Sequence, residues 1–341
     1  MKKVLQLIVK NKVALLMAAL SLPATVSMAQ DPEMTQFYAA PVYTNPAMAG
    51  TGSCGGRINL NYRNQWPTLD GTFRTFVASY DEHFGSISGG VGLMAMKDVA
   101  GQGLLTTTQF SGVYSYYLKP NRYSKVSMRF GVQADFMQKS LDWTKLRFAD
   151  QIDPIKGFIN PTKEPEPGAN VTYPNFSTGF LLYTDNFYGG VAVHNLTEPN
   201  QSFYNSPDEV LPRRYTAHAG LHISLEGKRR VTSDEDNSIS PNILFMLQQK
   251  FTQINLGFYA NRGPLVTGLW FRQTAGTYSN SDALIALIGF RKDKFKFGYS
   301  YDITVSSARA AVPGSHEISA AIEWCRRTPI RKYTPPKCPD F

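Results

Sequence analysis

The residues of this chain that could do chemistry are few, and their spacing forms no complete catalytic site. His218 and His222 are four residues apart, which is the spacing of zinc ligands on a helix. On a strand, four residues span about 13 Å, so both side chains cannot bind one ion, and we expect polar, inward-facing histidines. The run Gly89–Gly92 is similar to a phosphate-binding loop only in its glycines, because no lysine or helix signal follows. In a strand, such glycines allow bending or close packing.

Other reactive residues also lack catalytic spacing. His83, His194 and His316 occur singly, and the acidic run Asp234–Asp236 is typical of a solvated turn. The sequence contains no G-x-S-x-G, P-loop or C-x-x-C motif. We therefore expect a protein without enzymatic activity, with no catalytic residues, no metal site and no cofactor.

The elements that must position these residues are predicted to be strands. From Asp293 to Thr304, apolar side chains alternate with polar ones at every second position. Fourteen segments are predicted to be strands, although the third, ninth and twelfth alternate poorly. They lie near 57–66, 73–82, 88–97, 103–118, 124–139, 174–184, 186–196, 213–226, 238–251, 252–261, 263–272, 281–291, 293–304 and 314–325.

No amphipathic helix lies between these strands to cover their apolar face. A closed barrel explains the pattern, because lipid then covers the apolar outside and every backbone polar group is paired within the bilayer. We predict an all-β fold, a transmembrane antiparallel up-and-down β-barrel of about 14 strands in the outer membrane of a bacterium. Outer-membrane lipid is then an expected partner.

The chain begins with a predicted signal peptide over residues 1–29. Val13–Leu22 is an apolar stretch too short to span a bilayer as a helix, and Ser27-Met28-Ala29 has the small-x-small pattern that precedes cleavage. The predicted mature chain has three parts: an N-terminal segment over 30–56, the barrel over 57–325 and a basic periplasmic tail over 326–341. The first part lacks a strand pattern and is expected either in the periplasm or inside the barrel as a plug.

Charge excludes one class of partner and constrains the interior of the barrel. The net charge of +9 includes four signal lysines, which leaves about +5 for the mature chain and predicts no nucleic-acid partner. Charges that face the lumen need either water or pairing within a network. The predicted inward-facing charges are Arg57, Arg63, Asp81, Arg129, Asp135, Glu226, Lys296 and Asp302.

Aromatic residues are frequent, at 13% of the chain, and many lie near predicted strand ends. Outer-membrane barrels carry aromatic girdles at both membrane interfaces, so we expect these residues to form them. The predicted girdle residues are Trp66, Tyr80, Tyr116, Tyr117, Tyr183, Phe187, Tyr188 and Trp324.

The cysteines are too few for a disulfide scaffold, but an exported protein meets an oxidising environment in which one bridge can form. Cys338 follows Cys325 by thirteen residues, and closing such a loop contributes about 3 kcal/mol in the chain-entropy model. Barrel closure also brings Cys54 beside Cys325. The spacing favours a Cys325–Cys338 bridge, and a Cys54–Cys325 bridge and three free thiols are the alternatives.

The longest connection, Ser140–Tyr173, is expected outside the cell if the first strand runs outward. Its apolar side chains must either fold over the mouth of the barrel or meet a partner. We predict that it forms a lid or a docking surface together with Thr197–Pro212. The candidate residues are Trp143, Leu146, Phe148, Ile152, Ile155 and Phe158.

Several stretches of the chain resemble the PorP/SprF family of outer-membrane proteins, which is linked to the type IX secretion system and gliding motility. The most specific are Tyr62-Arg63-Asn64-Gln65-Trp66-Pro67 and the run His194–Asn200. The others are Gln30-Asp31-Pro32, Gln36-Phe37-Tyr38, Asn45–Gly50, Ser79-Tyr80-Asp81, Leu211–Tyr215, Gly298–Asp302 and His316–Ser319.

The resemblance implies a barrel without enzymatic activity. It also implies partners among type IX secretion or gliding proteins, or a secreted surface adhesin whose C-terminal domain the barrel helps to export or anchor. Two alternatives stay open on the sequence: an outer-membrane diffusion or uptake channel for small solutes, and a soluble β-rich binding protein.

Overall fold

The computed structural model describes residues 31–52, 55–69, 71–101, 104–118, 124–153, 155–166, 168–204, 206–207, 209–225, 237–275, 280–305 and 314–325. For residues 280–282 and 325 the backbone alone is described. The chain divides into two compact units, Met1–Asp31 and Pro32–Phe341, and every element below belongs to the second. The predicted signal peptide and the basic tail lie outside the described residues.

Strands make up most of the regular secondary structure of the second unit. The elements are α2 (Pro41–Thr44), η1 (Pro46–Met48), β1 (Gly55–Gln65), β2 (Phe73–Phe84), η2 (Gly85–Ile87), β3 (Gly89–Ala100), β4 (Leu105–Leu118), β5 (Ser127–Leu141), η3 (Trp143–Lys145), η4 (Ala149–Gln151), β6 (Ile152–Asp153), β7 (Gly157–Phe158), β8 (Asn170–Tyr183), β9 (Phe187–His194), β10 (Arg214–Leu221), β11 (Ile223–Ser224), β12 (Ser238–Gln248), β13 (Phe251–Arg262), β14 (Leu265–Ala275), β15 (Asn280–Lys292), β16 (Phe295–Thr304) and β17 (Ser315–Cys325). Within the described part of the chain, no helix is long and apolar enough to cross a membrane.

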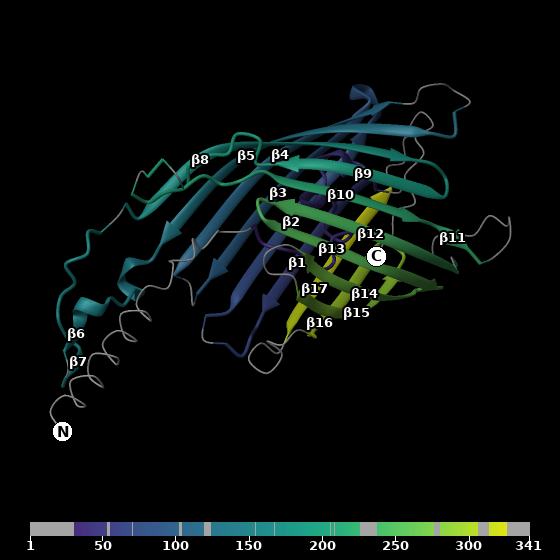
Figure 1. Ribbon diagram of the computed structural model, residues 1–341. Helices are drawn as coiled ribbons and strands as arrows, with labels where there is room; N and C mark the ends of the chain where they lie inside the picture. The colour runs from purple at the N-terminus through teal and green to yellow at the C-terminus, as the bar shows by residue number, and fades with distance from the viewer. Residues whose placement is uncertain are drawn as a thin grey trace, which may run out of the picture. The chain divides into compact units, whose positions relative to one another are not determined.

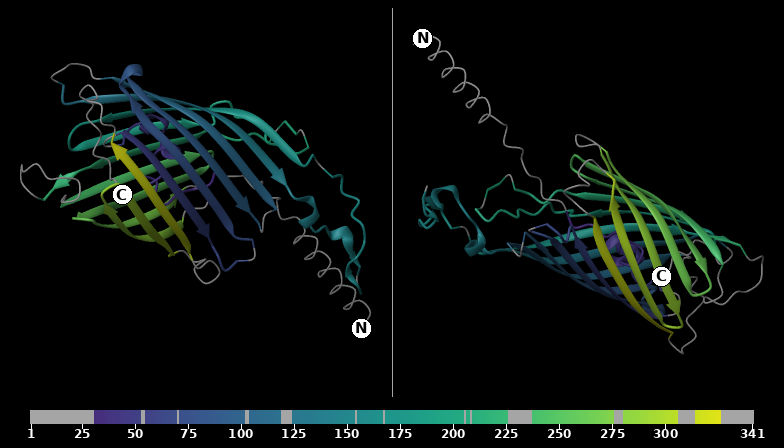
Figure 2. Two further views of the ribbon diagram at one scale, coloured as in Figure 1. Left: turned by 180° about the vertical axis from the view of Figure 1, so that it is seen from behind. Right: turned by 90° about the horizontal axis from the view of Figure 1, so that it is seen from below.

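Apart from β6 and β7, which pair only with each other, the strands form one closed antiparallel sheet, shown in Figures 1 and 2. Consecutive strands pair, β1 also pairs with β17, and β10 pairs with β12 to complete the ring. Because β11 continues β10 after an interruption at His222, the barrel has fourteen strands, as predicted. The predicted sixth strand begins four residues earlier than expected, at Asn170.

Connection lengths indicate which end of the barrel faces the cell exterior. The connections β2–β3, β8–β9, β13–β14 and β15–β16 are tight, whereas β5–β8, at the opposite end, contains twenty-eight residues (142–169). Bacterial barrels carry short turns in the periplasm and longer loops outside. The end that carries the β5–β8 loop is therefore the external end.

The two faces of β5 show which residue types face lipid and which face the lumen. Phe130, Val132 and Phe136 point outward and are exposed, whereas Arg129 and Asp135 point inward and are buried. This is the predicted assignment, and it leaves a continuous apolar belt for lipid. On the same outward side, Gln138 and Ser140 follow Phe136 and place the external edge of the belt within β5.

An arginine at the centre of this belt is expected to impair folding. Val132 lies midway along the outward side of β5, so Val132→Arg should destabilise the barrel by about 2–4 kcal/mol in a bilayer refolding titration. Gln138→Arg is the matched control on the same face of the same strand, and it should cost about 0–1 kcal/mol near the interface. Equal costs at both positions would contradict the placement of the belt.

Candidate functional site

The interior of the barrel contains the chain's own N-terminal segment, Pro32–Gly52, which we call the plug (Figure 1). It includes α2 and η1, and each of these short helices begins at a proline, which is favourable at a first helical position. Every residue from Met34 to Gly52 is buried. This segment therefore lies within the lumen and not beneath the barrel.

One end of the plug is held by a buried network of four charged wall residues. Arg63 pairs with Asp302 at 2.9 Å and with Glu317 at 3.3 Å. Arg272 pairs with Asp302 at 3.0 Å and reaches Glu33 of the plug at 3.0 Å. Buried charges persist when they are paired and hydrogen-bonded, and the charges at this end of the plug are paired within one network.

The plug backbone completes this network. The N–H groups of Thr35 and Gln36 donate to the two carboxylate oxygens of Glu317, at 2.6 and 2.9 Å. The Thr35 hydroxyl donates to Asp302 at 2.9 Å. Because charge-assisted bonds of this kind are strong, the wall carboxylates fix both the position and the register of the plug.

The other end of the plug is held by a second charged group. Arg129 donates to the carbonyl oxygens of Ala49 and Gly50, at 2.8 and 2.9 Å. The N–H of Gly50 donates to Asp81 at 2.8 Å, and Asp81 pairs with Arg57 at 3.0 Å. The plug is therefore anchored to the wall at both ends by buried charges.

Asn45 connects the middle of the plug to the opposite wall. Its carboxamide oxygen accepts from the N–H of Ala47 at 2.9 Å, which starts η1. Its Nδ2 donates to the carbonyl oxygen of Phe180 at 3.2 Å and lies 3.1 Å from Nε2 of His218. Asn45 of the Asn-Pro-Ala stretch thus both caps the start of η1 and hydrogen-bonds to the barrel wall.

Wall glycines make room for this close approach. A Cβ at Gly179 would lie 2.0 Å from Asn45 Oδ1, and a Cβ at Gly131 would lie 2.3 Å from the backbone nitrogen of Ala47. A Cβ at Gly90 would lie 2.2 Å from the carbonyl oxygen of Ala49. Close packing, one of the two roles expected for the Gly89–Gly92 run, is therefore confirmed at Gly90.

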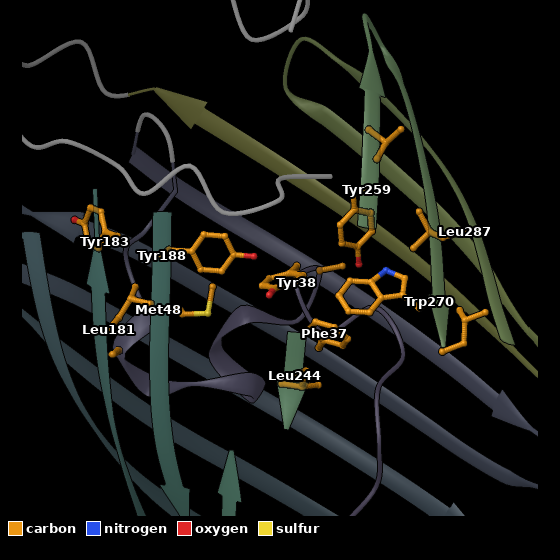
Figure 3. Close-up of a cluster of buried hydrophobic side chains, with 14 of the residues drawn as sticks. Phe37, Tyr38, Met48, Leu181, Tyr183, Tyr188, Leu244, Tyr259, Trp270 and Leu287 are labelled. Carbon is orange, nitrogen blue, oxygen red and sulfur yellow. The ribbon is translucent and has the colours of Figure 1, made fainter. Parts of the chain in front are cut away.

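An aromatic cluster fills the space between the plug and the wall (Figure 3). Phe37 packs edge-on against Trp270 with ring centroids 4.8 Å apart, and Tyr38 packs against Tyr188 at 5.8 Å. The girdle prediction is wrong for Tyr188 and for Tyr183, since both are fully buried in this cluster. The plug supplies an apolar surface inside the barrel, so aromatic character alone does not place a strand residue on the lipid side.

The histidines do not gather into a metal site. His218 is buried against Asn45, and His194 lies 3.3 Å from the carbonyl oxygen of Thr44. Within the described ranges, no three His, Cys, Asp or Glu residues lie close enough to hold an ion. Glu226 and the acidic run Asp234–Asp236 lie outside those ranges, as do Cys54, Cys338 and the Cys325 side chain.

The β5–β8 loop is partly folded on its own. Trp143 packs on Phe148 with ring centroids 4.9 Å apart, and β6 and β7 form a small hairpin. At its tip, the N–H groups of Ile155 and Lys156 donate to Asp153 at 2.9 Å each and hold the pKa of that carboxyl below its usual value.

The hairpin leaves apolar side chains in solvent. Ile155 is 93% exposed, Ile152 and Phe158 are about half exposed, and the neighbouring Ile159 is also exposed. Trp143, Leu146 and Phe148 are half-buried within the loop. The Tyr204 hydroxyl of the β9–β10 loop donates to the carbonyl oxygen of Pro165 at 3.1 Å, so the two predicted external loops do meet.

The apolar belt, the closed sheet and the filled lumen define an outer-membrane β-barrel with an internal plug. A family model described as type IX secretion system membrane protein PorP/SprF matches residues 26–322. The chain therefore belongs to the PorP/SprF family, which confirms the resemblance, the outer-membrane location and an association with type IX secretion. No curated protein matches the chain.

Solved barrels are similar only at low identity. Omp33 of Acinetobacter baumannii is 10% identical, with 80% of this chain and 100% of that chain covered and a TM-score of 0.44. The monoaromatic hydrocarbon channel CymD is 11% identical, with 85% and 94% covered and a TM-score of 0.48. The Pseudomonas putida toluene transporter TodX is 8% identical, with 87% and 94% covered and a TM-score of 0.44. Likeness at this level does not bear on function.

Proposed function

We propose that this barrel is a non-enzymatic docking component of the type IX secretion or gliding machinery. It holds a secreted adhesin's C-terminal domain, or a secretion component, at the cell surface and so supports export or anchoring. The observation that carries the proposal is the exposed apolar hairpin of the β5–β8 loop, Ile152–Ile159. Large side chains left in water on an external loop are typical of a protein-binding surface.

The plug argues against the alternative, a diffusion or uptake channel for small solutes. In a channel, inward polar side chains line a watery path. Here Arg129 and Glu317 hydrogen-bond to the plug backbone, and Arg63 pairs with Glu317. A barrel filled in this way serves better as a rigid platform for external loops than as a solute path.

Removing the apolar surface of the hairpin is expected to release the partner. In Ile152→Ser/Ile155→Ser/Phe158→Ser, the strands and the loop length are unchanged, but the anchoring side chains are lost. Losing such anchors costs about 2 kcal/mol or more, which is roughly a thirtyfold fall in affinity. The measurement is the amount of adhesin that co-purifies with the barrel in mild detergent and remains at the cell surface.

The matched control is Lys156→Ser/Lys163→Ser in the same loop, which removes exposed polar side chains and should leave retention unchanged. Heat-modified gel mobility reports barrel assembly for both variants. Wild-type retention by the well-assembled triple variant would rule out docking through this hairpin and would leave only a lid role for the loop.

A further inference from the structure

A separate feature lies on the lipid-facing side of β17, β1, β2, β3 and β4, near the external end. Outward side chains that are paired in register form rows across these strands. One row contains Ile318, Tyr62, Phe76, Lys97, Thr108 and Gln138. The next row toward the periplasm contains Ala320, Leu60, Ala78, Ala95, Phe110 and Phe136.

These rows enclose an apolar groove of about 560 Å³. The small side chains of Ala78, Ala95 and Ala320 line it, together with larger neighbours such as Leu60 and Phe110. Its volume lies in the range of roughly 300–1,000 Å³ that small ligands occupy. The groove runs within the apolar belt, so the surrounding solvent is lipid.

Two cations stand at the external end of the groove. Lys97 lines it directly, and Arg74 lies one row farther out, opposite Val99 on the neighbouring strand. Such diagonal positions of adjacent strands lie about 7–8 Å apart, so one anionic group can reach both side chains. Both side chains are exposed, and no ion pair of either is found within the described residues.

The nearest acidic residue along β3 faces the other way. Asp98 points into the lumen, where its carboxylate accepts from the Thr75 hydroxyl at 2.6 Å. Lys97 lies three residues before the external end of β3 at Ala100, and Arg74 is the second residue of β2, so both lie where these strands reach the external edge of the belt. Lys97 and Arg74 therefore stand at headgroup level in the outer leaflet, where a cation costs little.

We propose that this groove binds one lipid of the outer leaflet whose phosphate headgroup carries a net negative charge. An acyl chain occupies the groove over Ala78 and Ala95, and the phosphate bonds to Lys97 and Arg74. Arginine binds phosphate bidentately and lysine adds a point charge, so the pair selects an anionic headgroup over a zwitterionic one. This site is independent of partner docking by the loops.

A second outward groove provides an internal comparison. It has a volume of about 470 Å³ and lies on β10, β12 and β13, with Ala219, Leu221 and Ile243 among its lining residues. Its lining contains no charged side chain. Chain packing without headgroup selection is the behaviour expected there.

The test is native mass spectrometry of the full barrel in detergent, titrated with lipid A or with phosphatidylcholine. Lipid A is expected to bind at least about tenfold more tightly, which corresponds to 1.4 kcal/mol. Lys97→Gln/Arg74→Gln should abolish this preference, and Ala95→Leu should weaken lipid A binding by filling the groove with both cations present. Lys250→Gln, in the external β12–β13 turn, and Ala219→Leu, in the second groove, should leave binding unchanged.

Three results would overturn the proposal. The first is equal affinity for lipid A and phosphatidylcholine in the wild-type barrel. The second is wild-type lipid A binding by the double variant or by Ala95→Leu. The third is full displacement of lipid A by inorganic phosphate at millimolar concentration, which would show an anion site that needs no acyl chain.

Discussion

Gly131→Val is expected to displace the plug and to turn a poorly conducting barrel into an open pore. A Cβ at this wall position would lie 2.3 Å from the nitrogen of Ala47 and 2.4 Å from the carbonyl carbon of Pro46. Both atoms belong to the plug backbone and cannot move aside as a flexible side chain would. The strand itself tolerates the change, because valine is favourable in strands.

Ion conductance in planar bilayers measures this effect. The wild-type barrel should stay near baseline, and the variant should show the steps of a water-filled lumen, because the inward face is polar. Protease cleavage between Pro32 and Gly52 should rise in parallel. Gly112→Val is the matched control: this glycine faces outward on the adjacent strand β4, and an added Cβ meets nothing within 4 Å. A well-folded Gly131→Val barrel with baseline conductance would show that the plug adapts or that the lumen is sealed elsewhere.

Arg63→Met is expected to destabilise the barrel by about 3–5 kcal/mol, because it leaves two buried carboxylates without their shared partner. Arg63 pairs with both Asp302 and Glu317, and all three side chains are buried. Arg272 still pairs with Asp302 at 3.0 Å, so Glu317 loses most. Urea unfolding of the refolded barrel in lipid vesicles measures the change.

Two further variants separate the loss of pairing from the loss of packing. Arg63→Met/Glu317→Gln removes the stranded charge and should recover part of the lost stability, because the amide keeps one acceptor oxygen for the plug N–H groups where the carboxylate had two. Arg213→Met removes an exposed pair with Glu198 at 3.2 Å and should cost less than about 1 kcal/mol. If Arg63→Met costs no more than Arg213→Met, the network does not contribute to stability as argued.

The sequence alone determined the barrel. Alternation with period two places Phe130, Val132 and Phe136 on one side of β5, and a side chain cannot change sides without shifting the register of the whole strand. Because that pattern recurs in most of the fourteen segments and no covering helix lies between them, the strand number, the lipid-facing side and the membrane location follow from local residue types. The two specific family stretches added the type IX association in the same way, from residues adjacent in the chain.

Only the tertiary structure decided what fills the barrel. Residues 34–52 carry no period, and their positions depend on partners up to 283 residues away, such as Ser319, which donates to Gln36. The same long-range contacts explain why Tyr183 and Tyr188 face inward and why Gly131 and Gly179 must lack a side chain. The local pattern shows which side chains face lipid and which face the lumen. The plug, however, replaces water inside the barrel, so an aromatic residue type no longer shows whether the side chain faces lipid or the lumen. The position of the plug depends on contacts with many strands of the closed barrel, and no single stretch of sequence contains those contacts.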